Sequence, residues 1–233
     1  MHTVLLAVIM MALGVAQVSG IVIATHSAQG IVVGADSLEA SQSVLIDQLY
    51  SQKIYRINSL AYACFSSFDA ASFQICHRLR VVAKGAELED RLLGVSEIAA
   101  YAHNLASGIQ SSPHLVIVGS DIDGGLARQE DEEGESLRLP QKIFEVSSSG
   151  FMIEQSIATG GMGSGLALLI LENSKLHMKD CDKPASVAKT KKRINKILEA
   201  LRGADSSVHG KVRTFLLPNK IGENGTISPL ETI

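Results

Sequence analysis

The stretch that decides the fold runs from Gly20 to Ser37 and reads G-I-V-I-A-T-H-S-A-Q-G-I-V-V-G-A-D-S. It contains two runs rich in valine and isoleucine, Ile21–Ala24 and Ile31–Ala35, which are joined by the polar link Ser27–Gly30. β-Branched residues favour strands, and small polar residues favour the turn between them. The stretch therefore predicts a β-hairpin whose almost continuously apolar strands are covered on both faces.

The second strand of this hairpin ends in Asp36, a carboxylate directly after an apolar run. The simpler interpretation of an aspartate at this place is that it opens a turn. The residues that follow favour a second interpretation. Lys53–Ile57 has the pattern of a strand, Leu60–Phe65 is an apolar strand, and a turn at residues 66–71 leads into a helix.

In this order, Gly30–Ser37, Lys53–Ile57 and the turn at 66–71 resemble the β-type subunits of the proteasome and their bacterial relatives, which are N-terminal-nucleophile hydrolases. The resemblance is specific over residues 30–71 and looser from there to the C-terminus. It implies an α+β fold, the four-layer αββα sandwich of two antiparallel sheets. The expected order of strands, two helices, strands, two helices and strands fits the same architecture.

Length and composition exclude several classes of function. The 233 residues suit one large domain, and no internal repeat or linker divides them. The net charge of −3 argues against a nucleic-acid partner. The cysteines at positions 64, 76 and 181 have neither metal-ligand spacing nor the pattern of a disulfide framework. We therefore expect no metal, no other cofactor and no nucleic acid.

The N-terminal residues 1–19 have the character of a leader. Val4–Leu13 is an uncharged apolar run, too short for a stable membrane span but suited to the core of a signal peptide. Gly14–Ala16 offers one cleavage site of small residues, and Val18–Gly20 offers a second. No lysine or arginine precedes the run, so a pro-segment remains the alternative. We expect a domain at residues 20–233, exported if the leader is a signal peptide and cytoplasmic otherwise.

Helical periodicity predicts three of the helices. The first spans 69–83, stops at Gly85 and turns Phe73, Cys76 and Leu79 inward. The second opens at Ser96 and buries Ile98, Tyr101, Leu105 and Ile109; the third spans Pro184–Arg202. The Gly-rich turn at 160–165 leads into another apolar helical segment and lacks the Lys-Ser/Thr pair of a phosphate-binding loop. Asp121–Gly125 fits a hairpin turn better than a metal loop.

The resemblance also implies a set of catalytic residues. In the family, a threonine hydroxyl at the mature N-terminus is the nucleophile, and its own α-amine serves as the base. A lysine ammonium stabilises the developing alkoxide, and a carboxylate holds the lysine. Asp36 and Lys53 match the family's aspartate and lysine. Asp205 matches its supporting aspartate near the C-terminus, and Ser164 matches the serine of its Gly-Ser turn.

The nucleophile is where the sequence departs from the family. Counting back from Asp36 without a gap places Gly20 where the family has threonine. Ser19 lies one position away, and one extra residue in the hairpin link would bring it into register. Ser19 is thus the hydroxyl expected to act as nucleophile, although Val18 rather than a glycine precedes it.

Two functions remain open. One is an N-terminal-nucleophile peptidase that cuts peptide or protein substrates with Ser19, Asp36, Lys53, Ser164 and Asp205 at its centre. The other is a non-catalytic proteasome-like subunit or scaffold that keeps Asp36 and Lys53 as a structural ion pair. Either form is expected to be a homo-oligomer or ring. The basic face Lys189–Lys196 and the acidic segment Glu130–Glu135 have complementary charge.

Overall fold

The computed structural model describes residues 20–36, 39–41, 44–46, 53–66, 70–109, 114–122, 127–131, 134–147, 151–161, 163–173, 185–204, 212–219 and 231–232. The expected leader at 1–19 and Asp205 lie outside these residues. The structural statements below concern the described part of the chain.

The predicted hairpin is confirmed and lies inside the first sheet. Its strands are β1 (Ile21–Ser27) and β2 (Gly30–Asp36). The sheet has the order β12-β1-β2-β13-β14, with antiparallel neighbours throughout. The other members are β12 (Ile157–Gly161), β13 (Val212–Pro218) and β14 (Glu231–Thr232). The start of the chain thus pairs with segments from its second half.

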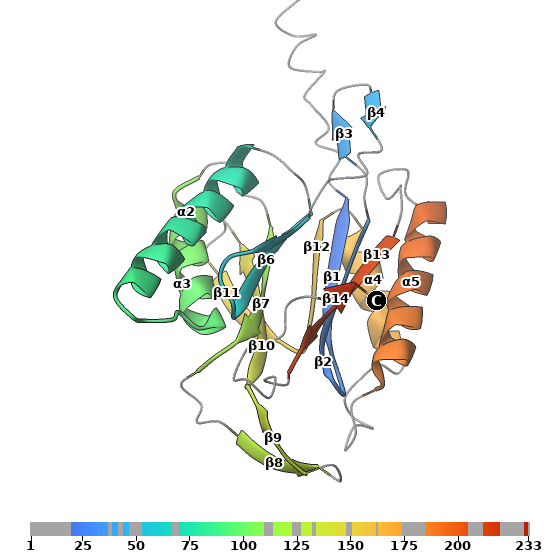
Figure 1. The fold of residues 1–233 in the computed structure, drawn as a ribbon. Helices are drawn as coiled ribbons and strands as arrows, with labels where there is room; N and C mark the ends of the chain where they lie inside the picture. The colour runs from blue at the N-terminus through green and yellow to red at the C-terminus, as the bar shows by residue number, and fades with distance from the viewer. Residues whose placement is uncertain are drawn as a thin grey trace, which may run out of the picture.

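The second sheet is also antiparallel and has the order β11-β10-β7-β6-β5. Its strands are β5 (Ile54–Arg56), β6 (Ala61–Phe65), β7 (Leu115–Ser120), β10 (Gln141–Ser147) and β11 (Phe151–Gln155). Two short hairpins project from the body in Figure 1. They consist of β3 (Glu39–Ser41) with β4 (Val44–Ile46), and of β8 (Ala127–Asp131) with β9 (Gly134–Arg138).

Four helices are described, and they cover the outer faces of the two sheets (Figure 1). The helices α2 (Ala70–Leu88) and α3 (Val95–Ser107) pack with the second sheet in one apolar cluster. The helices α4 (Ser164–Asn173) and α5 (Val187–Ala204) pack with the first sheet in another. A third cluster joins the two sheets. The expected α+β architecture of two antiparallel sheets between helices is confirmed.

Alternation of side chains explains why the hairpin strands are apolar throughout. Val22, Ala24 and Val33 belong to the cluster between the sheets. Their neighbours Ile23 and Val32 belong to the cluster beneath α4 and α5. Successive residues of a strand point to opposite faces, so a strand between two layers needs apolar residues at every position. The prediction of strands covered on both faces is confirmed.

The first predicted helix is longer than expected. The prediction that it stops at Gly85 is wrong, because α2 continues to Leu88 and buries Ala86 against the core. The chain turns at Asp90, whose φ of 55° is left-handed, a conformation that aspartate tolerates. Gly203, expected beyond the end of the last helix, likewise lies within α5.

Two aromatic residues that were expected to face inward are exposed. Phe73 is 56% exposed and stacks on His77, while Ser72 and Cys76 take the buried face of α2. Tyr101 is also exposed, although Ile98 of the same predicted stripe is fully buried. A shift of one position around a helix moves a side chain by about 100°, which periodicity resolves poorly at the edge of a stripe.

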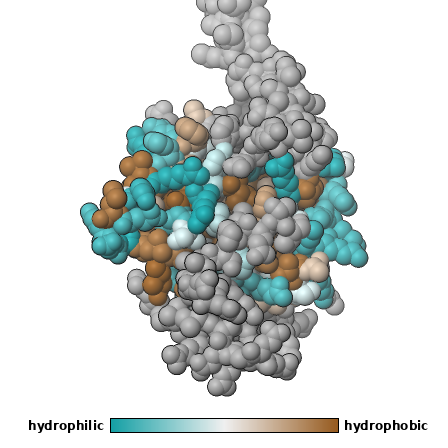
Figure 2. Space-filling model, viewed as in Figure 1, coloured by the Kyte–Doolittle hydropathy of each residue, from teal (hydrophilic) through white to brown (hydrophobic). Residues whose placement is uncertain are grey.

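The surface over α2 and α3 carries apolar side chains among hydrophilic ones (Figure 2). On α2, Val81 and Leu88 are exposed together with Phe73. Exposed apolar residues that gather on one helix are candidates for contact with another molecule. None of the described helices combines the length and the apolar character needed to cross a membrane.

Candidate functional site

A buried ion pair joins the two sheets at the end where β1 begins. The Lys53 ammonium lies 2.7 Å from Asp36 Oδ1, and both side chains are 1% exposed. Asp36 ends β2 in the first sheet. Lys53 directly precedes β5 in the second sheet, where its carbonyl accepts a hydrogen bond from Phe65 N–H at 2.9 Å. The structure thus brings together two of the predicted site residues, which are 17 positions apart in the chain.

The first residues of β1 contact the same carboxylate. The Ile21 backbone N–H donates to Asp36 Oδ1 at 2.7 Å. Gly20 faces the ion pair so closely that a Cβ atom on it would collide with Lys53 Nζ and with both oxygens of Asp36. Position 20 is therefore the point of the chain at which the ammonium and the carboxylate converge, and a side chain there would require the ends of Lys53 and Asp36 to move.

The two carboxylate oxygens of Asp36 differ in the number of hydrogen bonds that they accept. Oδ1 accepts from both Lys53 and Ile21. Oδ2 is buried and has no hydrogen-bond partner among the described residues. A buried acceptor without a donor costs roughly 1–3 kcal/mol. The carboxylate therefore has capacity for one more donor on the side that faces Gly20.

Strand β12 and the end of β6 form the wall beside Gly20. Ile21 pairs with Gly161, whose φ is 102°. A Cβ atom on Gly161 would collide with the Gly20 carbonyl and the Ser66 side chain. Two conformational reasons thus require glycine at position 161: its left-handed φ and its close approach to both neighbours.

His114 and Glu145 lie near this wall, and the sequence interpretation did not single them out as site residues. His114 Nε2 lies 2.9 Å from a carboxylate oxygen of Glu145, and the Gln155 amide donates to the other oxygen at 3.1 Å. Phe65 pairs with Leu115, so Ser66 and His114 are the residues next to this pair at one end of their strands. The pairing of β6 with β7 places His114 beside Ser66, and this pairing cannot be derived from the sequence pattern.

Of the other predicted site residues, Ser164 is the one that lies in the described part of the chain. Ser164 is the first residue of α4, and its backbone carbonyl accepts a hydrogen bond from Thr159 Oγ1 at 3.2 Å. Its described contact is with Thr159 and not with Asp36 or Lys53. Ser19 and Asp205 lie outside the described residues, so their catalytic roles stay predictions.

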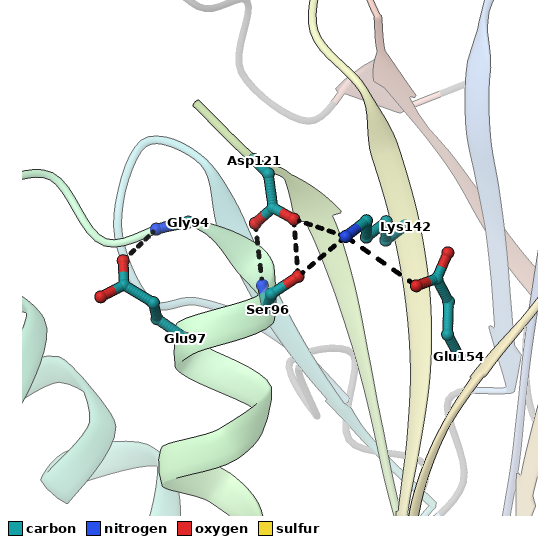
Figure 3. Close-up of polar contacts among 6 residues, drawn as sticks. All are labelled: Gly94, Ser96, Glu97, Asp121, Lys142 and Glu154. Atoms are coloured by element: carbon teal, nitrogen blue, oxygen red, sulfur yellow. Dashed lines mark hydrogen bonds and ion pairs between the residues drawn. The ribbon is translucent and has the colours of Figure 1, made fainter. Parts of the chain in front are cut away.

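A second polar cluster lies where α3 begins (Figure 3). Asp121, one residue after β7, accepts hydrogen bonds from the Ser96 N–H at 2.9 Å and the Ser96 hydroxyl at 2.6 Å. Lys142 Nζ lies 3.0 Å from Asp121 Oδ2 and 3.9 Å from Glu154 Oε2. The Glu97 carboxylate accepts the N–H of Gly94 at 3.2 Å.

The charges of this cluster stabilise one another. Burial alone raises the pKa of the Asp121 carboxyl, but the hydrogen bonds from Ser96 and Lys142 outweigh burial and hold that pKa below its usual value. The hydrogen bond to Asp121 likewise raises the pKa of Lys142. Lys142 is therefore a protonated ammonium that donates to its neighbours, and not a base that could activate the Ser96 hydroxyl.

The comparisons with known proteins add no family. Neither the models of protein families nor the curated proteins contain a match to this chain. Within the described residues, no three histidine, cysteine, aspartate or glutamate side chains are grouped so that they could hold a metal ion. The ion pair at Gly20 is therefore the strongest candidate site.

Proposed function

We propose that this chain is a proteasome β-like protein of the N-terminal-nucleophile hydrolase fold that acts as a non-catalytic subunit or scaffold. The observation that carries the proposal is the contact between Gly20 and the Asp36–Lys53 pair. In the family that the sequence resembles, the residue facing this lysine supplies the nucleophilic hydroxyl. Here that residue has no side chain, and the ion pair occupies the space that a side chain would need.

The ion pair has a structural role that requires no catalysis. It ties the end of β2 to the residue before β5, and Asp36 also holds the start of β1. Loss of one partner would leave a buried charge uncompensated, which typically costs about 3–5 kcal/mol. A non-catalytic relative would therefore keep both residues.

A hydrolysis assay tests the proposal. Purified protein is incubated with a panel of fluorogenic peptide amides, with Lys53→Met as the comparison. We expect no turnover that distinguishes the wild type from the folded variant. Turnover that depends on Lys53 would contradict the non-catalytic assignment.

A second candidate function is favoured by one observation, the buried Asp36 Oδ2 without a described partner. A hydroxyl or amine brought by a processed N-terminus at Ser19 could donate to it. The protein would then be a peptidase that cuts amide bonds by acyl transfer through the Ser19 hydroxyl. Since successive side chains of an extended strand alternate, Ser19 faces the pair only if the chain shifts by one residue.

Two variants distinguish this peptidase from the non-catalytic subunit. Ser19→Ala and Lys53→Met would each lower the rate of amide hydrolysis, the latter by about 10²–10³-fold, as for the loss of one oxyanion donor. Circular dichroism of both variants controls for folding. Equal activity in wild type and Ser19→Ala would eliminate Ser19 as the nucleophile.

A subunit role implies self-association. The exposed apolar residues Phe73, Val81 and Leu88 of α2 offer one surface. The basic residues Lys189, Lys192 and Lys196 are exposed on α5 and offer a second, charged one. Light scattering at low and high salt separates the two, because screening weakens only the charged contact. A strict monomer at micromolar concentration under both conditions would contradict a ring.

A further inference from the structure

The backbone nitrogen of Ile21 lies where an amino terminus would be well placed. It is 2.7 Å from Asp36 Oδ1 and buried, and Asp36 is 2% exposed. As a peptide nitrogen it carries one hydrogen, which it gives to Oδ1. The other oxygen of the same carboxylate, Oδ2, stays without a described donor. A nitrogen with more than one hydrogen at this place could serve both oxygens.

We propose that the mature chain begins at Ile21, and that its free amino group binds Asp36. The inference rests on the non-catalytic assignment, because it removes both Ser19 and Gly20 from the mature protein. The residues before the bond fit a leader peptidase, which requires small residues at the first and third positions before the cut. Gly20 and Val18 occupy those two positions.

The reaction is the hydrolysis of one peptide bond. A separate leader peptidase adds water across the bond between the Gly20 carbonyl carbon and the Ile21 nitrogen. The carbon–nitrogen bond breaks, Gly20 leaves with a carboxylate, and the proton goes to the Ile21 amine. Gly20 and Ile21 are both buried in the folded protein. Cleavage therefore precedes the insertion of β1 into its sheet.

The new amino group improves the hydrogen bonding of the site. An ammonium has three hydrogens, so it keeps the bond to Oδ1 and adds one to Oδ2. Such charge-assisted bonds are roughly twice as strong as neutral ones.

The charges already present at the site compensate the charge of this ammonium only in part. Lys53 already neutralises Asp36, so a second cation beside them is compensated only in part. A neutral Ile21 amine would still have two hydrogens, one for each oxygen of Asp36.

The first experiment determines the mature N-terminus. The full chain with a C-terminal tag is expressed in an exporting host, and the product is sequenced from its N-terminus and weighed intact. We expect a chain that begins with Ile21. Val18→Lys should abolish this product, whereas Ser19→Lys should not, because the position between the two small residues tolerates large side chains. A start at Met1, Gln17, Ser19 or Gly20 would overturn the proposal.

The result also separates this inference from the proposed function. A chain that begins with Ser19 and hydrolyses peptides would overturn both. A chain that begins elsewhere and hydrolyses nothing would overturn the inference alone. A chain that begins with Ile21 but shows turnover dependent on Lys53 would overturn the non-catalytic assignment and leave the cleavage site standing.

The second experiment tests the contact between the amine and Asp36. Removal of a fusion partner yields chains that begin with Ile21 or with Gly20, each with Asp36 or with Asp36→Asn. We expect the Ile21 form to melt about 2–4 °C higher, the shift that corresponds to roughly 1 kcal/mol in a domain of this size. The Asp36→Asn substitution should abolish most of this difference. Equal melting temperatures for the two Asp36 forms would contradict the contact.

Discussion

Asp121 caps the helix α3 from outside it: its Oδ1 accepts the backbone N–H of Ser96 at 2.9 Å. The residue in the N-cap position, Gly94, has no side chain to do this. A Cβ atom on Gly94 would strike Asp121 Oδ1, so glycine is what allows the aspartate to approach. The end of β7 and the start of α3 are thereby fixed to each other.

Replacement of Asp121 should destabilise the protein. Asp121→Ala removes the cap and leaves Lys142 without its closest carboxylate, so we expect a loss of about 1–2 kcal/mol, the usual cost of an N-cap. Urea denaturation followed by circular dichroism measures it. Ser96→Ala is the matched control, because it keeps the backbone N–H bond and should cost less. An Asp121→Ala variant as stable as the wild type would contradict the capping role.

The Asp121 contribution should disappear in acid. The pKa of the folded carboxyl lies below its ordinary value of 3.8, so its charged form stabilises the fold above about pH 4. The contribution is lost as the pH falls through the folded pKa. Asp121→Asn keeps the acceptor and removes the charge. The difference in unfolding free energy between wild type and this variant should shrink from pH 7 to pH 2.5; a constant difference would exclude the ionic contribution.

The Asp36–Lys53 pair should behave as one unit in a double-mutant cycle. Lys53→Met alone leaves a buried carboxylate and should cost about 3–5 kcal/mol. Asp36→Asn combined with Lys53→Met removes both charges, keeps an acceptor for the Ile21 N–H, and should cost less than the two single changes added together. Denaturant unfolding of all four proteins measures the coupling. Additive effects would show that the contact contributes no coupling.

Gly34 should tolerate no side chain while Ile194 lies above it. A Cβ atom on Gly34 would collide with Ile194 Cγ2 of α5. Gly34→Ala is therefore expected to cost about 1–3 kcal/mol by overpacking. Ile194→Leu removes the β-branch at similar volume and should recover part of this loss. The thermal midpoints of the single and double variants test the contact, and a double variant at the additive value would contradict it.

The part of the fold that follows from hydrophobic pattern was predictable. The hairpin β1–β2, the buried strand β6 and the helix α5 were all expected from the pattern of apolar residues. Predictions were wrong at positions where a buried surface meets an exposed one. Tyr101, at the edge of the apolar stripe of α3, was expected to be buried but is exposed.

The candidate site was predictable only where a motif fixed the residues. Asp36 and Lys53 were expected together because both lie in segments of specific resemblance, and the structure places them in contact. Ser66 directly follows β6, His114 directly precedes β7 and Glu145 lies in β10, and these strands become adjacent only in the folded sheet. The cap by Asp121 was missed for the same reason, since 25 positions separate it from Ser96.

Because of the order of the strands along the chain, the second sheet can be completed earlier during synthesis than the first. The second sheet uses only residues between Ile54 and Gln155, so its strands are all complete when the ribosome has passed that point. The first sheet needs β13, which pairs with β2 across more than 170 residues of chain. Contacts so far apart in sequence form slowly. Until β13 emerges, one edge of β2 is unpaired, and a nascent chain stalled there would present that edge to chaperones or to other chains.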